Sequence, residues 1–131
     1  MGIDLYLHWH GMTDAERAAQ VTGFSIEAGH LGYLREAYHG APYATPVLVP
    51  EAFKPEEEAG LPDGIPVSSS VLRERLPRVI ETAIEREAHV YGHDRRHSET
   101  RTVVKSFEDF VALCEAKEAD TGEPCRIVAS Y

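Results

Sequence analysis

The alternation of apolar and polar residues predicts a strand at each end of the chain. Residues 3–10 alternate between apolar and polar side chains, which is the two-residue period of a strand with one buried face. Residues 125–131 are mostly apolar or β-branched and follow the turn-forming residues 121–124, so they predict a closing strand. Residues 47–49 are β-branched and apolar and stand between two prolines, which predicts a short third strand.

Two short helices are predicted in the first third of the chain. Residues 13–16, Thr-Asp-Ala-Glu, have the capping-box pattern that satisfies backbone amides at a helix start, and this helix should reach about Val21. Residues 31–38 fit a second helix, which Gly40 and the following proline would end. In that helix Arg35 and His39 would share one face, because residues four apart are neighbours on a helix surface.

The second half of the chain predicts two long amphipathic helices. Apolar residues recur at helical spacing from Val71 to Ala88, with an interruption or a kink at Pro77, and again from Val103 to about residue 119. Residues 54–66 are rich in proline, glycine and glutamate, so they predict an exposed loop.

These elements predict an α+β fold in the order β-α-α-β-loop-α-α-β. We expect a small sheet that includes the N- and C-terminal strands and is covered by the two long helices on one face. The length of 131 residues fits a single globular domain that spans residues 1–131.

The charge balance argues against nucleic acid and anionic membranes as partners. The chain has 13 Lys and Arg against 22 Asp and Glu, a net charge of −9, whereas phosphate-rich partners are bound by clustered basic residues. No segment approaches the run of about 20 apolar residues that a membrane span needs, and the N-terminus lacks the features of a signal peptide, so we expect a cytoplasmic protein. Cys114 and Cys125 have no metal-knuckle spacing and are expected to be small core residues.

Residues 29–43 have the composition of a binding site. They contain two histidines, three tyrosines, three glycines, one arginine and one glutamate. Glycine lets backbone approach a ligand, tyrosine and histidine offer flat faces with polar tips, and arginine offers a planar fork for an anion. We therefore predict that a small polar or anionic ligand binds through this segment, and the candidate binding residues are His30, Tyr33, Arg35, Tyr38, His39 and Tyr43.

A metal-dependent hydrolase is the enzyme alternative. His8 and His10 would project from the same side of the first strand, where two imidazole nitrogens can converge on a divalent metal. His30 or His39 would supply a third ligand, and a nearby carboxylate would act as base on a metal-bound water. A half-exposed polar strand face explains the same pattern without a metal.

A third class of function is a protein-interaction module or a homo-oligomer. Tyrosine and arginine are common anchors of protein interfaces, so residues 29–43 fit an interface as well as a pocket.

Four stretches of the chain resemble a family of small uncharacterised bacterial proteins. They are residues 1–6 (Met-Gly-Ile-Asp-Leu-Tyr), 32–40 (Gly-Tyr-Leu-Arg-Glu-Ala-Tyr-His-Gly), 47–53 (Val-Leu-Val-Pro-Glu-Ala-Phe) and 125–131 (Cys-Arg-Ile-Val-Ala-Ser-Tyr). The resemblance implies a stand-alone protein, and it brings no activity, cofactor or catalytic residue.

Overall fold

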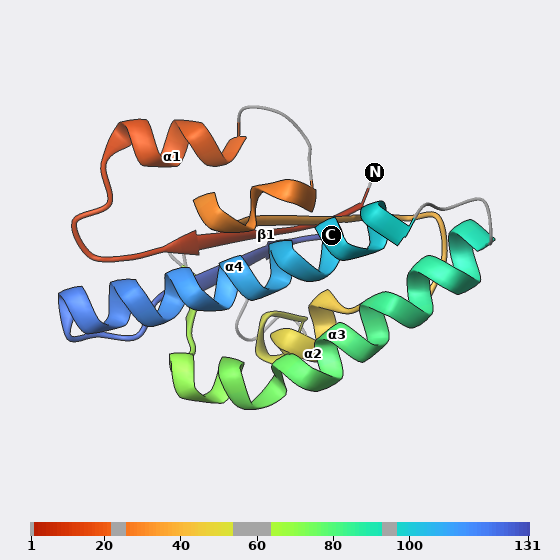
Figure 1. Ribbon diagram of the computed structural model, residues 1–131. Helices are drawn as coiled ribbons and strands as arrows, with labels where there is room; N and C mark the ends of the chain where they lie inside the picture. The colour runs from red at the N-terminus through yellow and green to blue at the C-terminus, as the bar shows by residue number, and fades with distance from the viewer. Residues whose placement is uncertain (1, 22–25, 54–63, 93–96) are drawn as a thin grey trace.

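The computed structural model describes residues 2–21, 26–53, 64–92 and 97–131 (Figure 1). Its elements in chain order are β1 (Gly2–His8), α1 (Asp14–Val21), the 3-10 helix η1 (Ile26–Leu31), β2 (Tyr33–Ala37), α2 (Thr45–Leu48), the 3-10 helix η2 (Pro50–Phe53), β3 (Ile65–Pro66), α3 (Ser69–Tyr91), α4 (His97–Thr121) and β4 (Arg126–Ser130).

The strands form one antiparallel sheet with the order β2-β1-β4-β3. The first and last strands are therefore neighbours, and Leu5 of β1 lies between Leu34 of β2 and Ala129 of β4. The long helices α3 and α4 run along one face of this sheet, as Figure 1 shows, which confirms the predicted α+β fold. Ile3, Leu5 and Leu7 project from β1 into the core on that face, where they are at most 4% exposed.

The local helix signals in the sequence are confirmed. The backbone N–H of Thr13 donates to Glu16 Oε1 at 2.9 Å, and the N–H of Glu16 donates to Thr13 Oγ1 at 3.1 Å, which is a complete capping box at the start of α1. The predicted interruption at Pro77 is wrong, because α3 runs as one element through this residue, whose side chain is exposed.

Cys114 and Cys125 are buried free thiols, as expected. Contact with the Cys125 thiol, together with burial, raises the pKa of Cys114.

The predicted helix over residues 31–38 is wrong, because this segment contains β2. Tyr33 and Arg35 project to one side of the sheet, while Leu34 and Glu36 project to the other. The alternation is hard to see in the sequence because Glu36, a charged residue, lies on the buried side and is only 3% exposed. Arg35 and His39 consequently share no helix face, since His39 lies beyond the end of the strand.

The predicted strand over residues 47–49 is also wrong, because residues 45–48 form the short helix α2. Pro46 stands in its first turn, where the missing N–H of proline costs no hydrogen bond. The Glu36 carboxylate accepts hydrogen bonds from the backbone N–H groups of Ala44 (2.9 Å) and Thr45 (2.7 Å) and from the Thr45 hydroxyl (2.6 Å). A side chain from the preceding strand, eight to nine residues earlier in the chain, thus caps the helix.

The predicted loop over residues 54–66 is corrected at its end. Residues 65 and 66 form β3 and pair with Ile127 and Arg126 of β4, while residues 54–63 lie outside the described part of the chain. The predicted order β-α-α-β-loop-α-α-β is therefore wrong in its middle and right at both ends.

We expect Glu36→Gln to lower the free energy of unfolding by about 2–3 kcal/mol, because the glutamine NH2 group would face a buried N–H donor. The exposed Glu81→Gln on α3 makes the same change of charge and should shift stability by less than about 0.5 kcal/mol. Urea unfolding followed by circular dichroism measures both values, and equal losses would contradict the capping role.

Candidate functional site

The predicted binding residues of segment 29–43 lie in three separate places. Tyr33 and Arg35 lie on the face of the sheet opposite the long helices. Tyr38, His39 and Tyr43 lie beyond the end of β2, beside the last turns of α3. His30 lies in η1 beside α4. The structure therefore does not bring the six residues together into one pocket.

Arg35 is held by an internal ion pair rather than presented as an open anion clamp. Its Nη1 donates to both oxygens of Asp4, at 2.8 and 3.0 Å, from the neighbouring strand. The Tyr33 hydroxyl donates to Asp4 Oδ1 at 2.5 Å, and the ring of Tyr6 lies 5.2 Å from that of Tyr33. Burial, and then the hydrogen bond to Asp4, raise the pKa of the Tyr33 phenol. This cluster links β1 to β2.

The second group is organised by Arg86, a residue of α3 that the sequence analysis missed. Arg86 is only 5% exposed, and its guanidinium donates to the carbonyl oxygens of Ala37 (2.6 Å) and Gly40 (3.1 Å). The same group lies 5.2 Å from the centre of the Tyr43 ring, and His39 Nδ1 is hydrogen-bonded to the Tyr91 hydroxyl at 2.9 Å. These hydrogen bonds and the cation–π contact hold residues 37–43 against the C-terminal end of α3.

Two glycines of the segment serve close packing within the protein. A Cβ atom at Gly29 would overlap the backbone carbonyl of Ser106 on α4, and the N–H of Gly29 donates to Ser106 Oγ at 3.0 Å. Gly32 has a φ of +86°, and a Cβ atom there would lie 2.7 Å from the amide nitrogen of Gln20. Gly29 and Gly32, two of the three glycines that indicated a ligand, are therefore explained by contact with α4 and α1.

A polar pocket of about 270 Å³ lies at the other end of β1. We call it the His–Arg pocket, and its lining residues are His8, Trp9, His10, Gly11, Met12, Arg17, Glu123, Pro124 and Arg126. Two arginines and two histidines thus face a single carboxylate.

Three segments that are distant in the sequence position these side chains. His8 at the end of β1 is the cross-strand partner of Arg126 at the start of β4, and Arg17 comes from α1. Arg126 Nη1 donates to the carbonyl of Gly64 at 3.3 Å, which leaves its charge without a counter-ion among the described residues. The exposed guanidinium of Arg17 makes no side-chain hydrogen bond or ion pair to any described residue. Both arginines are consequently available to an anion.

No family model, curated protein or solved structure matches this chain. The resemblance to small bacterial proteins therefore stays a prediction. Among the described helices, none is long and apolar enough to cross a lipid bilayer.

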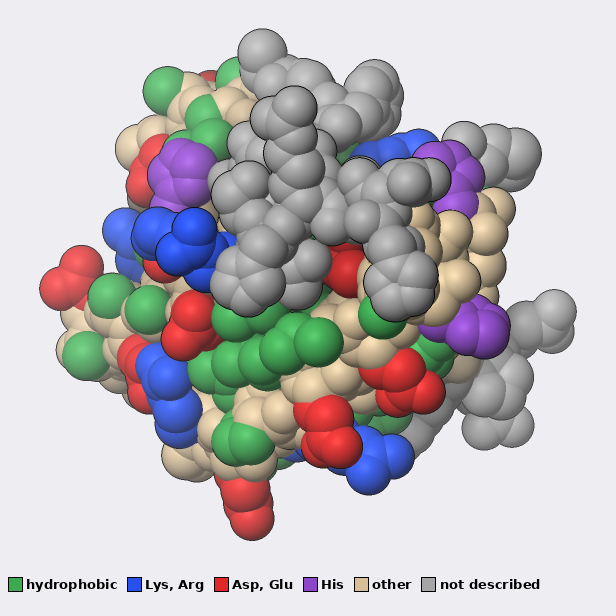
Figure 2. All heavy atoms as spheres, turned by 45° about the vertical axis from the view of Figure 1, so that its right-hand side comes forward, with side chains coloured by type: hydrophobic (Ala, Val, Ile, Leu, Met, Phe, Trp, Pro, Cys, Tyr) green, Lys and Arg blue, Asp and Glu red, His purple; other side chains and the backbone are tan. Residues whose placement is uncertain are grey.

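Two residues predicted to bind a metal, His8 and His10, border one pocket, and no third ligand joins them among the described residues. His8 and His10 border the same pocket, although β1 ends at His8 and His10 lies in the exposed turn that follows. Within residues 2–21, 26–53, 64–92 and 97–131, no three His, Cys, Asp or Glu side chains are grouped as a metal site requires. On the face shown in Figure 2, the histidine side chains also lie apart from one another. The metal-dependent hydrolase therefore stays a prediction from the sequence. The protein-interaction or homo-oligomeric role of residues 29–43 also stays a prediction.

Burial of the Tyr33 phenol, together with its hydrogen bond to Asp4, should make stability depend on pH in the alkaline range. The folded state raises the Tyr33 pKa, whereas an unfolded tyrosine ionises near pH 10, so the unfolded state alone gains from ionisation above about that pH. The free energy of unfolding of the wild type should therefore fall more steeply above pH 10 than that of Tyr33→Phe. The matched control Tyr38→Phe keeps Tyr33 and should keep the wild-type slope, and parallel curves for all three proteins in urea unfolding would refute this account.

Proposed function

We propose that the protein binds a small oxyanion, such as a phosphate or a compact carboxylate, in the His–Arg pocket. The observation that carries this proposal is the gathering of Arg17, Arg126, His8 and His10 around one pocket of about 270 Å³. A guanidinium is a planar fork that matches two oxygens of a phosphate or carboxylate, and the bonds formed are charge-assisted.

The charge distribution of the chain supports this choice of ligand. The chain has a net charge of −9, and the face in Figure 2 carries acidic and basic side chains interspersed. The His–Arg pocket, lined by two arginines and one glutamate, has a local excess of positive residues in this acidic chain. Glu123 would accept a hydrogen bond from a hydroxyl of the ligand, which favours a polar ligand over an apolar one.

The proposal keeps the ligand class that segment 29–43 suggested and assigns it to a different site. Arg35 is paired with Asp4, and Tyr33 is 1% exposed, so neither is offered to a small molecule in solution. In the His–Arg pocket, by contrast, Arg17 is exposed and reaches the pocket from a helix that carries no partner for it among the described residues.

We expect Arg17→Gln and Arg126→Gln each to raise the dissociation constant for inorganic phosphate about tenfold, because each removes one charge-assisted contact worth about 1.4 kcal/mol. The matched control is Arg78→Gln, which removes one exposed positive charge from α3, away from the pocket. Isothermal titration at constant ionic strength measures the three values.

The control separates a site from a general effect of charge. Arg78→Gln should bind phosphate like the wild type. If all three variants weaken binding equally, the effect is one of net charge, and if the wild type gives no saturable heat, the pocket does not bind this anion.

A further inference from the structure

A second pocket, with a different lining, lies between α1, η1 and α4. Its volume is about 290 Å³, close to the lower end of the range for small-molecule sites. We call it the Trp9–Leu113 pocket, and its lining residues are Trp9, Ala15, Glu16, Ala19, His30, Leu31, Leu113 and Lys117. Five of these side chains are apolar, and the charged groups are Glu16 and Lys117.

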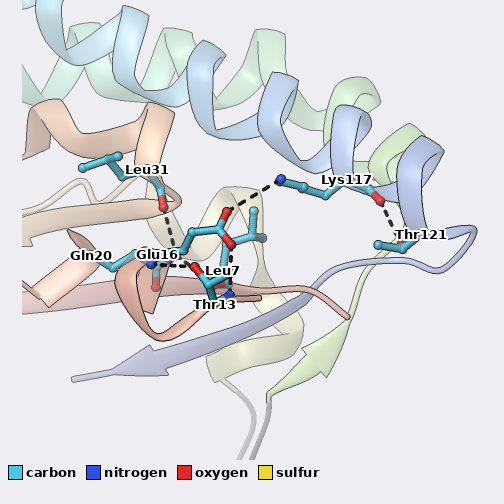
Figure 3. A network of polar contacts seen from close by, with 7 residues as sticks. All are labelled: Leu7, Thr13, Glu16, Gln20, Leu31, Lys117 and Thr121. Carbon is cyan, nitrogen blue, oxygen red and sulfur yellow. Dashed lines mark hydrogen bonds and ion pairs between the residues drawn. The ribbon is translucent and has the colours of Figure 1, made fainter. Parts of the chain in front are cut away.

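The pocket exists because α1 is attached to the rest of the protein by polar contacts. Gln20 is the one buried residue of α1, and its Nε2 donates to the carbonyl oxygens of Leu7 and Leu31, both at 2.9 Å (Figure 3). The side chains that α1 places in the pocket are the small Ala15 and Ala19 together with Glu16. Methyl groups leave the space that larger side chains would fill, so an apolar volume remains beneath the helix.

Lys117 provides an unused donor group at this apolar volume. Its Nζ lies 4.8 Å from the centre of the Trp9 ring and 3.8 Å from Glu16 Oε2, which is beyond hydrogen-bond distance. Glu16 is itself engaged elsewhere, because its other oxygen accepts the N–H of Thr13 (Figure 3). The Lys117 side chain is only 26% exposed, and its ammonium donates no hydrogen bond to any described residue.

We propose that the Trp9–Leu113 pocket binds a small aromatic carboxylate. The ring of the ligand packs against Trp9 and Leu113, where aromatic stacking adds to apolar burial. The carboxylate accepts hydrogen bonds from the Lys117 ammonium and replaces the long contact with Glu16. Glu16 lines the same pocket, but its Oε1 is held by the Thr13 N–H, whereas the Lys117 ammonium donates no hydrogen bond to a described residue, so we expect an apolar acid to bind more tightly than the corresponding alcohol.

This site is independent of the proposed oxyanion site. The two pockets share only Trp9 among their lining residues, and their cationic groups differ. Arg17 and Arg126 belong to the His–Arg pocket, whereas Lys117 belongs to this one. If one of the two pockets proves not to bind its ligand, the proposal for the other pocket can still be tested.

Trp9 is the single tryptophan of the chain, so its fluorescence reports directly on the pocket. We expect titration with 3-phenylpropionate to change the Trp9 emission saturably. Lys117→Gln should raise the dissociation constant for this acid about tenfold and leave that of the uncharged 3-phenyl-1-propanol unchanged, because only the acid uses the ammonium. Ala19→Phe, which fills the volume, should abolish binding of both probes, with folding checked by circular dichroism.

The control Arg17→Gln distinguishes this pocket from its neighbour. It should leave the affinity for 3-phenylpropionate at the wild-type value, and nuclear Overhauser contacts should join the ligand ring to the methyl groups of Leu113 and Ala19. The proposal is overturned if the wild type shows no saturable change, if Lys117→Gln binds the acid as tightly as the wild type, or if Arg17→Gln weakens binding instead. Should Ala19→Phe fail to fold, the comparison of acid and alcohol in Lys117→Gln still decides.

Discussion

The antiparallel pairing of β1 with both β2 and β4 determines which charged and histidine side chains lie opposite one another in the sheet. On one side it sets Asp4 opposite Arg35, and these two residues neutralise each other. On the other side it sets His8 opposite Arg126, where no carboxylate of the sheet intervenes. A shift of one residue in either register would move every side chain of the strand to the opposite face. The same pairing that buries Leu5 and Leu7 therefore creates both the ion pair and the pocket.

Helix α1 adds the second constraint, because its attachment is polar. A helix held by a broad apolar stripe would close the space beside it, whereas α1 is anchored by Gln20 at its end and is capped by Thr13 and Glu16 at its start. Both pockets use residues of this helix, and both use Trp9. The two pockets thus lie where a helix with a single buried residue meets the sheet and α4.

The sequence predicted those features that depend on neighbouring residues. The terminal strands, the capping box at Thr13 and the two long helices follow from short periodic patterns, and all were found. The errors at residues 31–38 and 47–49 share one physical cause: Glu36 is buried because it caps α2, and no local pattern indicates that a glutamate will face the core. The His–Arg pocket was anticipated only through His8 and His10, because the contribution of Arg126 depends on a register between strands more than 100 residues apart.

The arginines of the described chain divide into those that the fold pairs internally and those that it leaves without a counter-ion. Arg35 and Arg75 form ion pairs with Asp4 and Glu51, and Arg86 is buried against backbone carbonyls. The guanidinium groups of these arginines are already paired within the protein, because their charge-assisted hydrogen bonds connect one element to another. Arg126 bonds only to a carbonyl, which satisfies a donor without cancelling a charge. The charge of Arg126 is therefore not cancelled by any described carboxylate, and this is the reason for proposing the His–Arg pocket as an anion site.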